Sequence, residues 1–237
     1  WATQYIALQG QMDLPVTYTE VQFEGPGQER RQTLPDITQA VREHPAFVLL
    51  GEPGCGKTTT LEKIAFEHAR AKLAGEEARI PLFVRLAEQR GASPEDFLKK
   101  MWEKRTDLPF ADMLRTGRLL ILADGVNEIA RAARRSVLVE WKRFTREALE
   151  QGNQVVFSAR IKDYDAELTL PRVDVDRLDP ERVREYLARH DSADLLQELH
   201  DPDVWELAEN PFYLMMLVAY YRQFHEIPRS RAVLMRA

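Results

Sequence analysis

Short apolar runs alternate with segments of helical periodicity through most of the chain. Each run is bounded by turn residues, a pattern typical of strands that are buried on both faces. Strands that alternate with helices in this way predict an α/β fold in three layers, a parallel sheet with helices on both faces. The predicted strands are 46–51 (AFVLLG), 80–86 (IPLFVRL), 118–125 (RLLILADG) and 154–160 (QVVFSAR), with a fifth expected within 170–178 (LPRVDVDRL).

Capping residues and apolar spacing mark the helices between these strands. Asp36 is the expected N-cap of a short helix that stops at Pro45, and Ser93, followed by Pro94, is the expected N-cap of another (SPEDFLKKMW). Two longer helices follow the first and third predicted strands, and the second of them is expected to end at Gly152. Their predicted buried faces are Leu61, Ile64, Ala65, Ala69 and Leu73 in one, and Val137, Trp141, Phe144 and Ala148 in the other.

The two ends of the chain depart from this pattern. Residues 15–23 (PVTYTEVQF) form a possible strand, and 24–32 (EGPGQERRQ) are expected to be a loop. After Leu178, DPERVREYL and DPDVWELA each offer Asp as N-cap and Pro as first helical residue, and NPFYLMMLVAYYRQF is a strongly apolar third helix. We therefore expect a lead-in at 1–35, an α/β domain at 36–178 and a strand-free helical subdomain at 179–237. The apolar stripe of the third helix is expected in the subdomain core rather than in a partner groove; it comprises Phe212, Leu214, Met215, Met216, Leu217 and Tyr220.

Composition narrows the class of protein. The chain has 237 residues, 44% of them hydrophobic and 30% charged, with a formal net charge of −5, which weighs against a dedicated nucleic-acid binder; no nucleic-acid motif is visible either. No long apolar run or signal peptide is visible, so no membrane span is expected.

The single cysteine, Cys55, excludes an internal disulfide and fits a cytoplasmic location. The histidines are scattered, so a zinc site is not expected. Because the chain begins at Trp1 and stops within a helical pattern, we expect a fragment of a longer protein.

The turn after the first buried strand carries a phosphate-binding pattern. GEPGCGKT (Gly51 to Thr58) matches G-x-x-x-x-G-K-[ST] and lies between a strand and a helix, as that motif requires. Its glycines permit positive φ, its backbone N–H groups form a nest for phosphate oxygens, and the next helix adds its positive end. We expect Lys57 to reach the β- and γ-phosphates, Thr58 to ligate Mg²⁺ and Thr59 to bond an α-phosphate oxygen. The other predicted nucleotide contacts are Gly51, Glu52, Pro53, Gly54, Cys55 and Gly56, with Cys55 read as a small filler or, alternatively, as an acidified thiol.

Carboxylates after the third strand complete the predicted chemistry. Asp124 ends an apolar strand at the edge where open α/β sheets bind ligands, which predicts a metal ligand rather than a turn or helix-cap aspartate. Gly125 follows it, so the usual adjacent glutamate is missing. Glu128 is the carboxylate in this turn that can activate water, its alternative being a solvent-facing loop acid.

Two basic features lie nearby. Arg160 follows Ser158 at the end of the fourth strand, and it is expected to sense the γ-phosphate unless it merely caps a surface loop. The cluster RAARR (Arg131 to Arg135) is either a solvated helix start or a contact with a neighbouring subunit. The predicted catalytic residues are Lys57, Asp124, Glu128 and Arg160.

From about Phe47 to Arg236 the chain resembles the NACHT-type signal-transduction ATPases of the STAND class. The phosphate loop is shared with many NTPases, whereas LLILADGVNE, VVFSAR, IPLFVRL and AENPFYLMMLVAYY…IPRSRAVLMR are more specific to that family. The resemblance implies an ASCE-type P-loop sheet of order 5-1-4-3-2, with ATP or dATP bound between the sheet and the helical subdomain. It also implies that Pro211 packs beside the adenine and that a winged helix follows Ala237.

The resemblance further implies a switch for immune or defence signalling. ADP holds such proteins closed and ATP permits self-association, with effector and sensor domains outside the present chain. Two departures are visible: Asn127 stands where the family has a carboxylate, and the winged-helix histidine falls beyond Ala237. We therefore expect a slowly hydrolysing ATPase that acts as a regulatory switch. The alternatives are an AAA+-like remodelling ATPase with continuous turnover, or a nucleotide-gated scaffold without hydrolysis.

Overall fold

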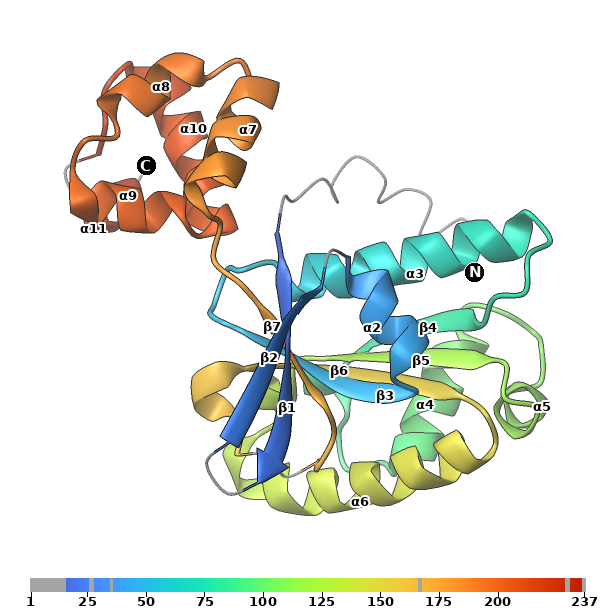
Figure 1. Cartoon of the computed structure of the whole chain (residues 1–237). Coiled ribbons are helices and arrows are strands. Elements are labelled where there is room, and N and C mark those ends of the chain that lie inside the picture. Colours follow the sequence, from blue (N-terminus) through green and yellow to red (C-terminus); the bar gives the residue numbers. More distant parts are fainter. Residues whose placement is uncertain (1–15, 26–27, 35, 166–167, 229–230, 236–237) are drawn as a thin grey trace. The chain divides into compact units, whose positions relative to one another are not determined.

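The computed structural model describes residues 16–25, 28–34, 36–165, 168–228 and 231–235 (Figure 1). The contacts within the chain divide these residues into two compact units. The first contains Tyr18–Glu52 and Lys57–Asp174, and the second contains Pro53–Gly56 together with the segment from Val175 onward. The tip of the phosphate loop thus belongs to the second unit, although the chain on either side of it belongs to the first.

The first unit is built on one sheet whose parallel strands follow the predicted positions. In space the strands are ordered β2-β1-β7-β3-β6-β5-β4. The parallel part, β7-β3-β6-β5-β4, is 5-1-4-3-2 when its strands are numbered along the chain, so the strand order implied by the resemblance is confirmed. The bounds are β1 Tyr18–Gly25, β2 Gln28–Leu34, β3 Ala46–Gly51, β4 Ile80–Arg85, β5 Leu119–Asp124, β6 Gln154–Arg160 and β7 Arg172–Val175.

The prediction of a loop at 24–32 is wrong, because most of this segment is strand. Residues Gln28–Leu34 form β2, which pairs antiparallel with β1 and lies at the edge of the sheet. Arg30, Arg31, Gln32 and Thr33 are all exposed there. An edge strand has a neighbour on one side only and tolerates such polar residues, whereas the pattern of a buried strand does not contain them.

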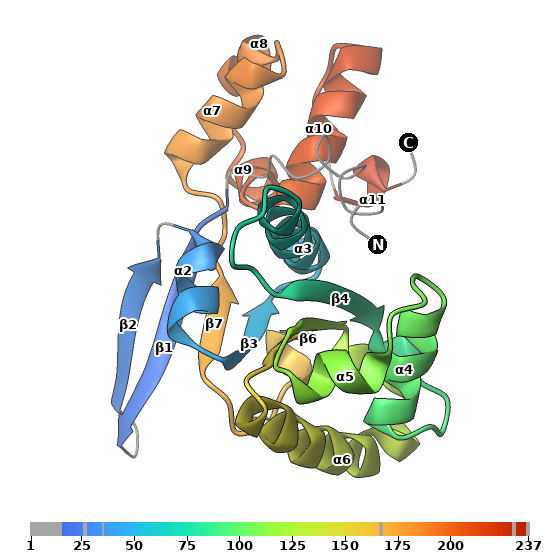
Figure 2. The same ribbon diagram turned by 90° about the vertical axis from the view of Figure 1, so that its right-hand side faces the viewer.

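The central strands are apolar because both of their faces are covered. Every residue of β3 and β5 is buried, and β4 and β6 are buried except for their last residues, Arg85 and Arg160. One face packs against α4 (Pro94–Glu103), α5 (Phe110–Arg115) and α6 (Arg131–Glu150), with Trp102 and Trp141 fully buried. On the opposite side of the sheet from α6 lie α2 (Ile37–Glu43) and α3 (Lys57–Leu73) (Figures 1 and 2). The three-layer α/β prediction is therefore confirmed.

The predicted caps of this unit are also observed. The Asp36 carboxylate accepts a hydrogen bond from the Thr38 amide at 3.0 Å, and the Ser93 hydroxyl accepts one from the Asp96 amide at 3.2 Å. The prediction that Leu73 is buried is wrong, since this residue is 61% exposed in the last turn of α3. Helix α5 escaped prediction because its six residues are too few to establish a period.

His68, in the second half of α3, is expected to make the stability of this unit depend on pH. Its Nδ1 is buried without a hydrogen-bond partner. Burial lowers the pKa of His68 below its ordinary value of 6.5; a hydrogen bond to the Arg79 backbone opposes this, and the Arg79 charge adds to it. The folded protein thus favours the neutral imidazole, so this contribution to stability is present above the unfolded pKa and is lost as the pH falls through the folded pKa.

We expect the free energy of unfolding to fall less on acidification in His68→Gln than in the unsubstituted protein. Denaturant titrations at about pH 7.5 and about pH 5.5 measure this difference, and carboxylate titrations common to both proteins cancel. An equal loss of stability in the two proteins would show that His68 titrates normally in the folded state.

The second unit is helical throughout its described part beyond β7. Its helices are α7 (Pro180–Arg189), α8 (Ala193–Glu198), α9 (Pro202–Ala208), α10 (Pro211–Phe224) and α11 (Arg231–Leu234). The predicted starts are confirmed, because Asp179, Asp201 and Asn210 each accept a hydrogen bond from an amide in the first turn. The core prediction for α10 is right for Leu214 and Leu217, which are buried, and wrong for Phe212 and Met215, which are 41% and 48% exposed.

Candidate functional site

The loop between β3 and α3 has the backbone conformation that its glycines predict. Gly54 and Gly56 adopt φ values of +79° and +98°, in the left-handed region that L side chains rarely occupy. The side chain of Cys55, between them, is buried. Helix α3 begins directly after the loop at Lys57, so its N-terminal amides lie at the loop as a phosphate-binding turn requires.

The tip of this loop is held within the second unit by the start of α10. Asn210 is only 8% exposed; its Nδ2 donates to the Pro53 carbonyl at 3.0 Å, and the Phe212 amide donates to the Gly54 carbonyl at 3.3 Å. A Cβ at position 54 would lie 2.9 Å from the Phe212 Cβ and 3.0 Å from the Asn210 Oδ1, so only glycine fits. Pro211, buried as the first residue of α10, is thereby placed next to two residues that contact the loop.

Lys57 is turned back over the loop. Its Nζ donates to the carbonyls of Gly51 and Glu52 at 3.1 and 2.7 Å. An ammonium group held at the loop's own backbone is positioned to meet an anion bound by the same loop. Thr59 lies in the first turn of α3 and is half-buried.

Asp124 and Thr58 are brought together by the parallel sheet, although 66 positions separate them. The Thr58 hydroxyl donates to Asp124 Oδ2 at 3.0 Å, and the Asp124 side chain is almost fully buried. Its other oxygen accepts a hydrogen bond from the Ser158 hydroxyl, which in turn accepts one from the Gly125 amide at 2.9 Å. A hydroxyl and a carboxylate oxygen side by side are the hard oxygen donors that Mg²⁺ prefers, so these residues fit that ion.

The turn after Asp124 explains the missing adjacent glutamate. Gly125 has φ +83°, and a Cβ there would lie 2.9 Å from the Glu128 Cδ. The 3₁₀ turn Val126–Glu128 thus folds the exposed Glu128 carboxylate back over Gly125. Any side chain at position 125 would be strained and would displace Glu128, so the carboxylate of this turn comes from position 128 instead.

Arg160 and the basic cluster both lie next to this turn. The Asn127 Oδ1 accepts a hydrogen bond from the Arg160 amide at 3.1 Å, while the Arg160 side chain is exposed at the end of β6. Arg134 donates from Nη2 to the Asn127 carbonyl at 2.7 Å and, at 3.4 Å, to that of Ile129. Arg131 and Arg135 are exposed. One arginine of the cluster is therefore structural, and the others face solvent.

Sequence reasoning missed Glu62, a further acid near Asp124. Burial raises the pKa of Glu62, the charge of Arg85 lowers it and that of Asp124 raises it. Arg85, at the end of β4, is the register partner of Asp124. Helical spacing could have indicated Glu62 from the sequence, since it lies four residues after Thr58 on α3 and hence on the same face.

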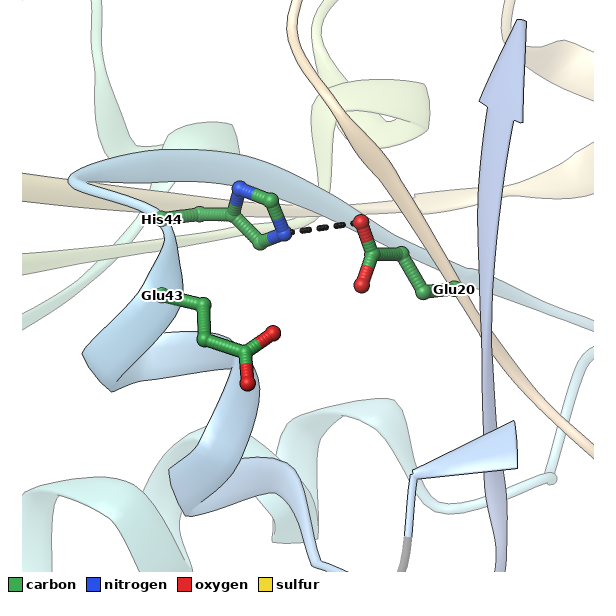
Figure 3. Close-up of side chains that lie close together, drawn as sticks. All are labelled: Glu20, Glu43 and His44. Carbon is green, nitrogen blue, oxygen red and sulfur yellow. Dashed lines mark hydrogen bonds and ion pairs between the residues drawn. The ribbon is translucent and has the colours of Figure 1, made fainter. Parts of the chain in front are cut away.

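A second group of ligand-type side chains lies between β1 and the end of α2. Ligand atoms of Glu20, Glu43 and His44 are all within 4.8 Å of one another, and the three side chains converge (Figure 3). His44 Nε2 and Glu20 Oε1 are 2.9 Å apart, and the Glu20 side chain is 1% exposed. This pairing provides a hydrogen-bond partner for a buried carboxylate, so we assign the contact to holding β1 against α2. Scattered histidines in the sequence did not indicate it.

In the part of the chain that the structure describes, no helix combines the length and apolar character needed to cross a membrane.

A comparison with solved structures finds proteins of similar fold at low sequence identity. AMPPCP-bound DnaA from Aquifex aeolicus aligns with a TM-score of 0.50 and 15% identity, over 78% of this chain and 59% of that chain. A Walker-type ATPase of Pyrococcus abyssi gives a TM-score of 0.48 and 15% identity, over 84% and 68%. Domain III of DnaA from Thermotoga maritima gives 0.46 and 14%, over 85% and 91%. The chain thus spans less than two thirds of the Aquifex protein.

A comparison with curated proteins finds no match. A protein-family model does match: the NACHT domain model covers residues 46–194, which is more than half of the chain. These residues include the phosphate loop, Asp124, Glu128 and Arg160. The chain therefore belongs to the NACHT domain family of P-loop NTPases.

Proposed function

We propose that this chain is the nucleotide-binding part of a regulatory switch that binds ATP with Mg²⁺ and hydrolyses it slowly. The observation that carries the proposal is the hydrogen bond of 3.0 Å between Thr58 and Asp124 beside a loop whose glycines have positive φ. The loop would hold the phosphates with its amides and Lys57. Mg²⁺ held by Thr58 and Asp124 would neutralise phosphate charge.

The α/β domain at 36–178 would supply the phosphate and metal contacts, and the helical subdomain at 179–237 would supply Pro211 for the adenine. The contact of Asn210 with the Pro53 carbonyl supports a role for the start of α10 in nucleotide binding. Exchange of ADP for ATP would then control self-association of a larger cytoplasmic protein with effector and sensor domains, in immune or defence signalling.

The turn after Asp124 favours slow hydrolysis over continuous turnover. A remodelling ATPase would have an acid directly after Asp124, and the left-handed conformation of Gly125 disfavours any side chain there. Glu128 is exposed and can therefore meet a water molecule, which favours a slow ATPase over a scaffold that does not hydrolyse. Steady-state ATPase assays on the purified chain test the proposal, and rapid continuous turnover would overturn it.

We expect Glu128→Gln to lower the basal rate of ATP hydrolysis about 100-fold, because an amide cannot accept the proton of the attacking water. The rate of phosphate release under single-turnover conditions measures this loss, and the nucleotide affinity should stay the same. Glu77→Gln is a matched control, since Glu77 is an exposed acid in a different loop. A Glu128→Gln protein with an unchanged basal rate would show that Glu128 does not activate water.

A further inference from the structure

Asn127 stands where the family resemblance implies a carboxylate. Its contacts suggest what role an asparagine can fill at this position. Its side-chain Oδ1 accepts a hydrogen bond from the Arg160 amide at 3.1 Å. The ladder between β5 and β6 ends at the pair Ala123 and Phe157, three residues before Arg160. The Asn127 side chain therefore supplies the acceptor that a longer β5 would have offered to β6.

The turn that carries Asn127 is itself anchored. The Arg134 guanidinium donates to the Asn127 carbonyl at 2.7 Å, so this residue is held through its main chain as well as through its side chain. The same turn is joined to β6 at a second point, where the Gly125 amide donates to the buried Ser158 hydroxyl at 2.9 Å. The turn is thus hydrogen-bonded to β6 at two places, from Gly125 to Ser158 and from Asn127 to Arg160. These two contacts fix the position of the end of β6 relative to Asp124.

We propose that Asn127 is a positioning residue that holds Arg160 in place for sensing the γ-phosphate. The inference rests on the proposed function, because it gives the sensing role to Arg160. The position requires a hydrogen-bond acceptor and not a negative charge, since the group that it meets is a neutral main-chain N–H. Asparagine and aspartate both present such an oxygen. An asparagine at position 127, in place of the carboxylate of the family, can therefore still fill this role.

The experiment compares Asn127→Asp, which keeps the acceptor, with Asn127→Ala, which removes it. Each is made alone and combined with Arg160→Ala in a double variant. Calorimetry on the whole chain with Mg-ATP and Mg-ADP gives the preference for ATP over ADP in each protein. Loss of one hydrogen bond should lower this preference about fivefold in Asn127→Ala, whereas Asn127→Asp should keep it. Arg160→Ala should remove the preference, and Asn127→Ala should then have no further effect.

Hydrogen exchange provides a measurement that does not depend on nucleotide. The Arg160 amide should exchange faster in Asn127→Ala than in the unsubstituted protein, and at the original rate in Asn127→Asp. Arg134→Gln, which releases the Asn127 carbonyl, should accelerate it in the same direction and replaces Asn127→Ala if that variant does not fold.

Three results would overturn the inference: an unchanged ATP preference in Asn127→Ala, an equal effect of this substitution without the Arg160 side chain, or an Asn127→Asp protein that behaves like the alanine variant. Failure of the proposed function looks different. In that case the unsubstituted chain shows no preference for ATP over ADP or binds neither, and the positioning role for sensing is lost with it, whatever the exchange data show.

Discussion

Replacement of Lys57 by alanine is expected to abolish nucleotide binding at micromolar concentrations. The Lys57 ammonium lies over the loop, 3.1 and 2.7 Å from the carbonyls of Gly51 and Glu52, and from there it can reach phosphates held by the loop amides. Charge-assisted hydrogen bonds to two phosphates contribute enough that their removal should weaken the affinity for ATP at least about 100-fold. Isothermal titration calorimetry with Mg-ATP measures the loss.

Lys72→Ala is the matched control for this prediction. Lys72 lies on the same helix, α3, but in its last turn, and its side chain is exposed. Removal of this charge should leave the affinity unchanged. Equal affinities for Lys57→Ala and the unsubstituted protein would refute the assignment of Gly51 to Thr58 as a phosphate loop.

Asp124→Asn is expected to remove the dependence of nucleotide affinity on Mg²⁺. The Asp124 side chain is 7% exposed and accepts hydrogen bonds from Thr58 and Ser158, so its carboxylate is already oriented beside the hydroxyl that would share the ion. An amide is a neutral and weaker ligand for this hard cation. Titration with ATP in Mg²⁺ and in EDTA should show a gain of about tenfold or more for the unsubstituted chain and almost none for the variant.

The affinity in EDTA serves as the internal control. It should be similar in both proteins, because the loop and Lys57 are unchanged, and a thermal melt shows whether Asp124→Asn is folded. Asp112→Asn, at an exposed position on α5, should keep the full Mg²⁺ effect. A variant at position 124 that retained this effect would place the metal on other ligands.

The strands were the most predictable part of the fold. Ala46–Gly51 and Leu119–Asp124 are buried at every residue, and a strand buried on both faces is readable as a continuous apolar run. Helices that begin with Asp or Ser followed by Pro were predictable for a local reason, since the capping group and its amide lie within three residues. Gln28–Leu34 was missed because an edge strand with exposed arginines has no such pattern.

Side-chain burial was less predictable than the elements themselves. Leu73, Phe212 and Met215 follow helical periodicity and are nevertheless exposed at 61%, 41% and 48%. Periodicity identifies the face that a helix can bury, but the extent of burial depends on how far the neighbouring element reaches along the helix. This information lies in other parts of the chain.

By itself the sequence determined the family, the parallel sheet, the phosphate loop and the candidate pair Thr58 and Asp124, because each depends on residues that are close together or on a strand end whose place in an α/β sheet is known. Tertiary structure alone decided the contacts between distant segments: Ser158 on Asp124, Asn127 on the Arg160 amide, and Asn210 on the Pro53 carbonyl. Each of these hydrogen bonds joins residues at least 33 positions apart, and its geometry depends on where separate strands and helices end, which no local pattern specifies.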